Sequence, residues 1–287
     1  MIGNRPISPS VPLAQPANRK KPLEILLESA KKMPHIVPLT GVSMAFTYPL
    51  RLLNNRSVAN GVTISHTFKL VTQEAKDTSN PFAFYKGVQF QITQQLSQNM
   101  TKQFAFLVFD NHLMNTFPNQ SLANHSMAGG LAGLLVDVPL GVALENRATR
   151  LQTGMARSPM SAFALAMLAF RDSSSSTAAF GLSRWMKETI PVLSEMKDGT
   201  VRHILCPTVT SVAVQLVATP AHNAYVYGLK HSGRSIPELW SGLTEKGVSG
   251  IWKGIGTRSI IFGVNNMILI GGFELWHSHA SRHQGGK

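Results

Sequence analysis

Cysteine and acidic residues are both scarce in this chain of 287 residues. The single cysteine, Cys206, excludes a small secreted domain held together by disulfides. Only 14% of the residues are charged, whereas a soluble domain carries about 25%. Most of the missing charge is acidic, because 27 Lys and Arg stand against 14 Asp and Glu, for a net charge of +13. So low a charge density excludes a disordered tail protein.

The basic excess is spread along the chain. Its longest run is residues 19–21, whereas a nucleic-acid-binding domain would gather its cations on one face. Hydrophobic residues make up an ordinary 44%. A low fraction of charged residues combined with an ordinary apolar fraction predicts a membrane protein whose outer surface contacts lipid. Its excess of basic residues would contact anions elsewhere.

Several stretches approach the roughly 20 apolar residues that a membrane-spanning helix needs. Each also contains small or polar residues, which favours helices with one face on lipid and another on a polar interior. The alternative is a large soluble bundle, but soluble helices would show charged outer faces. The stretches are 36–53, 89–109, 127–144, 204–219 and 255–276.

The N-terminus is basic but rich in proline. Residues 1–29 are therefore predicted to form a flexible basic arm, because prolines at this density prevent a helix. The segment matches a mitochondrial transit peptide in charge only.

Three segments of the chain read alike, which indicates an internal repeat. Each closes an apolar helix with a proline that we expect to kink it: Pro49, Pro139 and Pro220. A polar stretch follows each, and then an aromatic-basic-glycine phrase. We place these phrases at residues 84–87, at 181–185 in a decayed form, and at 245–254.

This pattern resembles the mitochondrial carrier family over about residues 30 to 280. The resemblance implies an all-α membrane protein with three pseudo-symmetric helix-pair repeats. Six transmembrane helices would surround a central cavity, with short amphipathic surface helices between the pairs. The repeats would occupy 30–118, 119–200 and 201–287 within one membrane domain. It also implies the mitochondrial inner membrane, with the outer membrane as the alternative. Membrane lipids are expected partners, with anionic phospholipid at Lys86-Gly87 and Lys253-Gly254; no nucleic acid is expected.

In the family, acidic and basic residues after each proline link the repeats by ion pairs. Here the acidic positions hold Arg51, Glu145 and His222, so a three-way ionic gate cannot form. We expect one Arg51–Glu145 pair with added hydrogen bonds from His222 and Tyr225. The alternative is that these residues are solvated at the membrane surface. The remaining candidates for this gate are Asn54, Arg56, Arg150 and Gln152.

The opposite gate of the family uses an aromatic-acid-x-x-base motif on the even-numbered helices. Phe273-Glu274 followed by His277 is a near match on the sixth helix. On the second helix the same spacing leads to Asp110, where a base belongs.

Family substrate contacts lie on the even helices, and the same count here reaches Gln94, Val192 and Ile261. No arginine stands at these positions, which departs from the pattern of nucleotide carriers. Arg258 is the best candidate for an anion, because a guanidinium forks onto carboxylate or phosphate; the alternative is that it reaches lipid headgroups. The glutamines have a second reading, as hydrogen bonds between packed helices. The other cavity candidates are Gln91, Gln95, Gln98, Lys102 and Asn265.

The second repeat is short. Residues 185–220 leave little room for a full fourth helix, a turn and a full fifth helix. We expect residues 158–170 to form an interfacial helix and residues 173–176 to form a loop. Gly129 and Gly133 stand four apart and predict a close approach of the third helix to a neighbour.

No catalytic arrangement, metal-ligand spacing or cofactor motif is evident, and we expect no enzyme, cofactor or metal site. Two hypotheses remain. The first is a transporter that moves a small anionic metabolite, such as a nucleotide or phosphate, by alternating access. The second is a carrier-like structural subunit or scaffold that does not transport, because a fold can outlive its function. The sequence also leaves open a pathogen-made mimic of a carrier.

Overall fold

The computed structural model describes residues 22–271, except 157–158, 195–198 and 246. The described residues form helices and no strand, which confirms the all-α class. The N-terminal elements are α1 (Pro22–Asn60), α2 (Ile64–Asp77), a 3₁₀ turn (Ala83–Tyr85) and α3 (Val88–Thr116). Residues 22–29 of the predicted flexible arm are therefore helical, because Pro22 stands in the first turn of α1, where a proline is tolerated. The C-terminal elements are α9 (Pro191–Ser194), α10 (Gly199–Ala213), α11 (Gln215–Lys230), α12 (Ile236–Thr244), α13 (Gly247–Ile251), α14 (Ile255–Asn266) and a π-helical segment (Met267–Gly271).

Two long helical runs fill the middle of the chain. The first joins α4 (Ser121–Ala132), a π-helical turn (Gly133–Asp137), α5 (Val138–Leu140), a second π-helical turn (Gly141–Glu145) and α6 (Asn146–Thr153). The second joins α7 (Ala162–Ser176), a π-helical turn (Thr177–Leu182) and α8 (Ser183–Thr189).

One helix of the described chain, Ser121–Thr153, is long and apolar enough to cross a membrane. The pair Ile204–Ala213 and Gln215–Lys230 passes the same test if it is taken as one span bent by 53°.

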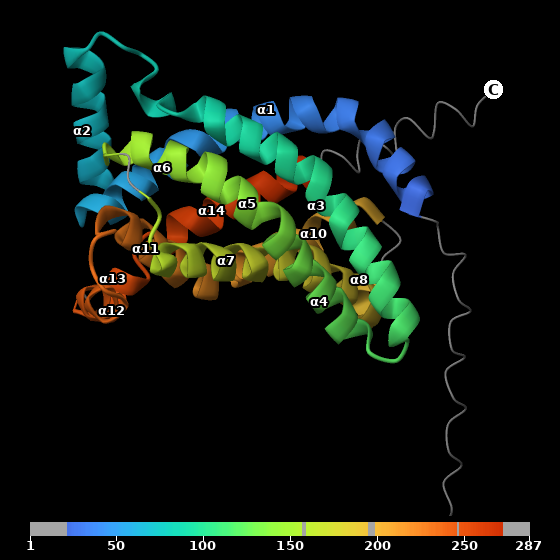
Figure 1. Ribbon diagram of the computed structural model, residues 1–287. Helices are drawn as coiled ribbons and strands as arrows, with labels where there is room; N and C mark the ends of the chain where they lie inside the picture. The colour runs from blue at the N-terminus through green and yellow to red at the C-terminus, as the bar shows by residue number, and fades with distance from the viewer. Residues whose placement is uncertain (1–21, 157–158, 195–198, 246, 272–287) are drawn as a thin grey trace, which may run out of the picture.

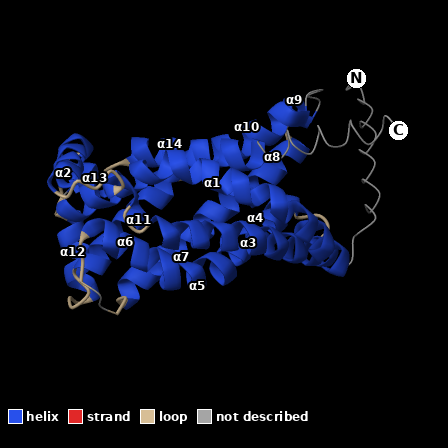
Figure 2. Ribbon diagram, turned by 90° about the horizontal axis from the view of Figure 1, so that it is seen from above, coloured by secondary structure: helices blue, strands red, loops and turns tan. Residues whose placement is uncertain are grey.

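The long helices lie side by side along the bundle. Figures 1 and 2 place α2, α12 and α13 together at one end, beside α6 and α11. α3 and α8 reach the opposite end. α7 lies between these two ends of the bundle.

Pro49 lies inside α1, and a side chain from elsewhere supplies the hydrogen bond that the proline removes. A proline lacks the N–H that would bond the carbonyl four residues earlier, here that of Ala45. The Tyr85 hydroxyl, from the first aromatic-basic-glycine phrase, donates to that carbonyl at 3.0 Å. Tyr48 in turn donates from its hydroxyl to the Lys86 carbonyl at 2.6 Å. The phrase is thereby fastened to the helix that precedes it.

The third repeat uses the same device. Pro220 frees the carbonyl of Leu216, and the Trp252 indole Nε1 donates to it at 2.8 Å. Both phrases end on a glycine with positive φ that starts the next helix, +84° at Gly87 and +78° at Gly254. The two prolines and their phrases are thus equivalent in structure as well as in sequence.

The second repeat departs from this pattern, and the sequence interpretation of it was wrong. Pro139 lies between two π-helical turns in a helical run that continues to Thr153. The supposed phrase at residues 181–185 is helical throughout and forms no glycine turn. Gly181 instead packs against the backbone of His125, where any side chain would collide.

The serine run at residues 173–176 is helical, not a loop. It packs against the glycine face of α4: a Cβ on Gly129 would lie 2.8 Å from the Ser176 carbonyl oxygen, and one on Gly133 equally close to that of Asp172. Small residues on both helices allow this approach, as predicted from the two glycines. Residues 162–189 thus form one continuous helical run, which begins well before the residues 185–220 in which little room for a fourth helix was expected.

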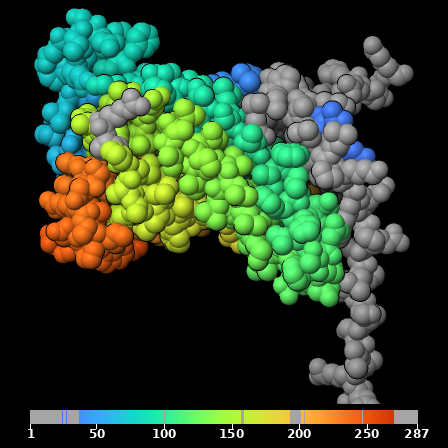
Figure 3. Space-filling model, in the orientation of Figure 1, coloured from blue at the N-terminus to red at the C-terminus, as the bar shows by residue number. Residues whose placement is uncertain are grey.

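The outer flank of the middle runs is apolar. Exposed hydrophobic side chains along it include Leu134, Leu135, Val142, Leu165 and Phe170. Figure 3 shows the face that these green to yellow segments form beside α3. Such a flank is consistent with contact to lipid or to a protein partner.

The Trp252–Leu216 hydrogen bond provides a test of the proline device. Trp252→Phe should lower the free energy of unfolding by about 1 kcal/mol more than Trp240→Phe, because it leaves the Leu216 carbonyl without a donor. Trp240 is 55% exposed and is the matched control. Thermal and denaturant unfolding in detergent measure both. Equal losses would show that the indole contributes packing alone.

Candidate functional site

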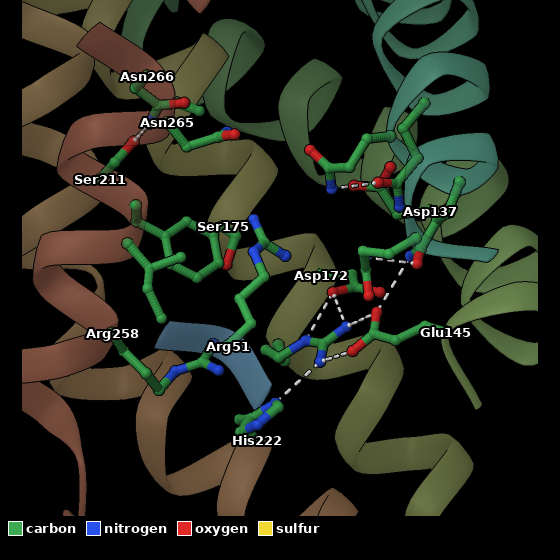
Figure 4. Close-up of a pocket in the computed structure, with 18 of the residues that line it drawn as sticks. Arg51, Asp137, Glu145, Asp172, Ser175, Ser211, His222, Arg258, Asn265 and Asn266 are labelled. Carbon is green, nitrogen blue, oxygen red and sulfur yellow. Dashed lines mark hydrogen bonds and ion pairs between the residues drawn. The ribbon is translucent and has the colours of Figure 1, made fainter. Parts of the chain in front are cut away.

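A polar cavity of about 150 Å³ lies between the long helices. Its walls come from α1, α3, the 133–145 segment, α7, α10, α11 and α14. Figure 4 shows charged and amide side chains converging on it from all sides. The sequence candidates that line it are Arg51, Asn54, Gln91, Gln94, Gln95, Gln98, Lys102, Glu145, His222, Arg258 and Asn265. Ile261 lines it too, whereas Val192 is 73% exposed on α9 and takes no part.

An ion pair between Arg171 and Glu145 forms one end of the cavity. The two guanidinium Nη atoms lie 2.5 and 2.7 Å from the two carboxylate oxygens of Glu145. Arg171 also reaches Asp172 Oδ1 at 2.6 Å, and only 5% of Arg171 is exposed. This forked geometry is the strongest that a guanidinium makes with a carboxylate. The pair fixes α7 against the second π-helical turn of the preceding run.

His222 extends this network as a neutral imidazole. Its Nδ1 lies 3.0 Å from an Arg171 Nη, and because a guanidinium only donates, Nδ1 must accept. Its Nε2 then donates to Asn55 Oδ1 at 2.9 Å. Asn55 extends the network further, because its Nδ2 donates to Gln152 Oε1 at 2.6 Å. One continuous network therefore joins α1, α6, α7 and α11.

The predicted Arg51–Glu145 pair is wrong, because Glu145 is taken by Arg171. Besides the two hydrogen bonds from Arg171, Glu145 accepts one from Gln94 Nε2 on α3, at 3.1 Å. His222 makes hydrogen bonds, but to Arg171 and Asn55 and not to the predicted pair. Tyr225 contributes its ring instead, 5.4 Å from the Arg171 guanidinium, and its hydroxyl has no hydrogen-bond partner in the described chain.

Arg51 and Arg258 both lie close to the ring of Phe262. Their guanidinium carbons are 5.8 and 5.2 Å from the ring centroid, within cation–π distance. Arg258 donates from Nε to Gln215 Oε1 at 3.3 Å, and Arg51 Nε has no hydrogen-bond partner. Neither forms an ion pair with a described carboxylate. Arg258 is 5% exposed, so it faces the interior and not the headgroups.

The facing wall carries carboxylates. Asp137 accepts from Lys102 Nζ and from Ser176 Oγ, both at 2.8 Å and both on Oδ2. Asp172 uses Oδ1 for Arg171. Both are at least nine-tenths buried, and the second oxygen of each has no partner. Figure 4 shows Arg51 and Arg258 to one side and Asp137 to the other, with Asp172 between them.

Two further gate candidates stand outside the cavity. Arg56 donates to Glu74 of α2 at 2.5 Å, and this hydrogen bond lowers the pKa of the Glu74 carboxyl. Arg150 donates to the carbonyl of Ala156 at 2.5 Å and so closes the end of α6. Both residues fasten surface segments to long helices.

Asp110 belongs to a separate charged cluster, sixteen residues beyond Gln94 and thus about 24 Å along α3. It pairs with Arg184 at 2.7 Å and with His125 Nδ1. His125 Nε2 lies 3.0 Å from Glu188. Because both ring nitrogens face carboxylates, both donate and the imidazole is cationic. The cluster joins α3, α4 and α8; Glu274 and His277 of the predicted gate lie outside the described residues.

The expected lipid positions share one geometry. Lys86 and Lys253 each precede the positive-φ glycine that starts a helix. Lys86 Nζ lies 3.7 Å from Glu74 Oε1. The helix starts at Gly87 and Gly254 add the partial positive charge that favours anions.

Arg171 and Asp172 are the functional residues that sequence reasoning missed. They follow an apolar segment and precede four serines, which placed them at a loop boundary. The sequence feature that could have revealed them is the run of small residues at 173–176, because small residues on two helices, here with Gly129 and Gly133 of α4 and the turn after it, indicate close helix packing. Asp137 stood out as the only charge in residues 127–144 but was given no role.

No protein-family model matches this chain, and no curated protein does. The described residues contain no group of three or more His, Cys, Asp or Glu side chains that could hold a metal ion.

Removing Arg171 should destabilise the protein strongly. Arg171→Met leaves Glu145 buried without its main partner, which typically costs about 3–5 kcal/mol in the free energy of unfolding. Arg234→Met, on an exposed turn, is the matched control and should change little. Thermal unfolding in detergent compares them. If the two variants are equally stable, the network is dispensable for the fold.

Proposed function

We propose that this protein is a transporter of the mitochondrial-carrier type, which moves a small metabolite with an acidic group by alternating access. Arg51 and Arg258 carry the proposal, since two guanidiniums that face an internal cavity without a carboxylate partner form a site for an anion. In the proposed transport cycle, the acidic group of the metabolite binds the guanidiniums of Arg51 and Arg258, beside the Phe262 ring.

The six-span architecture belongs to this proposal. Its spans would be α1, α3, the run 121–153, the run 162–189, the bent pair α10–α11, and the helix that begins with α14. The equivalent prolines and phrases of the first and third repeats support a repeat architecture. The position of α2 and α12 after odd-numbered spans also agrees with it. The inner mitochondrial membrane remains the expected location on the resemblance alone.

The two charged networks would act as the gates of such a transporter. The network of Arg171, Glu145, His222 and Asn55 closes one end of the cavity by joining helices of all three repeats. The Asp110–His125–Arg184 cluster joins α3 with α4 and α8 at the other end. Hydrogen bonds and ion pairs of this kind can exchange between two packed states.

Transport by purified protein in liposomes tests the proposal. Vesicles preloaded with phosphate, nucleotides, carboxylates or amino acids should exchange at least one labelled acid. Arg51→Gln should lower that rate by about tenfold or more, because a charged hydrogen bond in a desolvated site is worth more than 1.4 kcal/mol.

Arg234→Gln, far from the cavity, should retain the wild-type rate. If no acid exchanges, and a partner protein co-purifies stably on native gels, the non-transporting subunit or scaffold replaces this proposal. An exchange rate that Arg51→Gln leaves unchanged would remove Arg51 from the site.

A further inference from the structure

The cavity is electrically polarised. α1 and α14 supply two guanidiniums without an ion-pair partner among the described carboxylates, Arg51 and Arg258, whereas the 133–137 segment and α7 supply Asp137 and Asp172. Asp137 is 3% exposed and Asp172 is 8% exposed. Asp137 pairs with Lys102 and Asp172 pairs with Arg171 through one oxygen each, so this wall offers the cavity two free acceptor oxygens, which an anion cannot use.

Each wall also has unused hydrogen-bonding capacity. Asp137 Oδ1 and Asp172 Oδ2 are buried acceptors without a donor, and Arg51 Nε is a buried donor without an acceptor. Ser175 Oγ, on the same wall as Asp172, is unpartnered as well. Buried polar groups are almost always paired, and each one left alone costs about 1–3 kcal/mol. Several such groups of both kinds around one cavity indicate a ligand that pairs with them.

The missing partner must therefore donate on one side and accept on the other. An ammonium group carries three donors and no acceptor, so it matches the two free carboxylate oxygens. A carboxylate accepts through both oxygens, so it matches a guanidinium. We propose that the cavity binds a small zwitterion, an amino acid, with its carboxylate on Arg51 and Arg258 and its ammonium on Asp137 and Asp172.

This inference rests on the proposed transport site and names its substrate class. A zwitterion adds no net charge to the cavity, whereas a simple anion would meet the carboxylates and a simple cation would meet the arginines. The volume of about 150 Å³ lies below the range of about 300–1,000 Å³ typical of drug-sized ligands, which selects a small molecule. The amide side chains of Gln91, Gln95 and Asn265 can pair with a polar substituent.

The experiment compares ligands that differ only in the ammonium group. Thermal-shift titrations of purified full-length protein would use L-alanine against L-lactate, L-serine against glycerate, and L-glutamate against 2-hydroxyglutarate. At least one amino acid should bind about tenfold or more tightly than its hydroxy acid, since the hydroxyl replaces a charged donor. Ligand binding to the folded state raises the unfolding temperature.

Variants separate the two walls. Asp172→Asn should remove the preference for the amino acid while leaving the hydroxy acid bound equally or more tightly. Arg51→Gln should weaken both. Asp137→Asn tests the same wall if Asp172→Asn, which loses part of the Arg171 network, does not fold. Asp77→Asn on the exposed end of α2 is the matched control and should bind as the wild type does.

The outcomes distinguish this inference from the proposed function. Hydroxy acids that bind as tightly as amino acids, through Arg51, overturn the zwitterion and leave anion transport standing. Binding of none of these ligands, with transport of none, overturns both. A preference for the amino acid that survives both aspartate substitutions overturns the assignment of the ammonium site.

Discussion

The forked pair between Arg171 and Glu145 is the interaction on which the rest of the structure depends. Two opposite charges buried among helices are stable only when every remaining donor and acceptor is satisfied. Gln94 also donates to Glu145, and Asp172 and His222 accept from Arg171. His222 in turn donates to Asn55, which donates to Gln152. Satisfying one pair thereby positions helices of all three repeats. It also removes Glu145 from the reach of Arg51, which is left free for a ligand.

The sequence predicted the helical class and most residues of the cavity wall because these depend on local pattern. The prolines, the glycines and the spacing of the polar residues along α3 can each be recognised within a short stretch of the sequence. The partners of those residues could not be predicted in the same way. Glu145 and Arg171 are 26 positions apart, and their meeting depends on how the second repeat folds back on itself. The expected pair with Arg51 followed the family pattern, which this chain does not keep.

The second repeat was misread for a physical reason. Serine competes for backbone hydrogen bonds in isolated peptides and therefore suggests a loop. Here Ser173 donates to the Gly130 carbonyl at 3.2 Å and Ser176 donates to Asp137 at 2.8 Å. The glycine face of α4 makes room for both. Contacts between helices thus override the local preference, and they bring the carboxylates of this repeat to the cavity.

The proline devices of the first and third repeats have a consequence for how such a sequence can change. Each proline and its aromatic partner form one unit across 36 or 32 positions, since the carbonyl that Pro49 or Pro220 frees is filled by Tyr85 or Trp252. The side chain that fills it must carry a hydrogen-bond donor, as tyrosine and tryptophan do. A phenylalanine in place of Tyr85 or Trp252 leaves the free energy of unfolding unchanged only when the proline is replaced too, because the helix then recovers its own backbone N–H donor. Related chains should therefore exchange both positions together, and a phrase that has lost its tyrosine or tryptophan should accompany a helix without its proline.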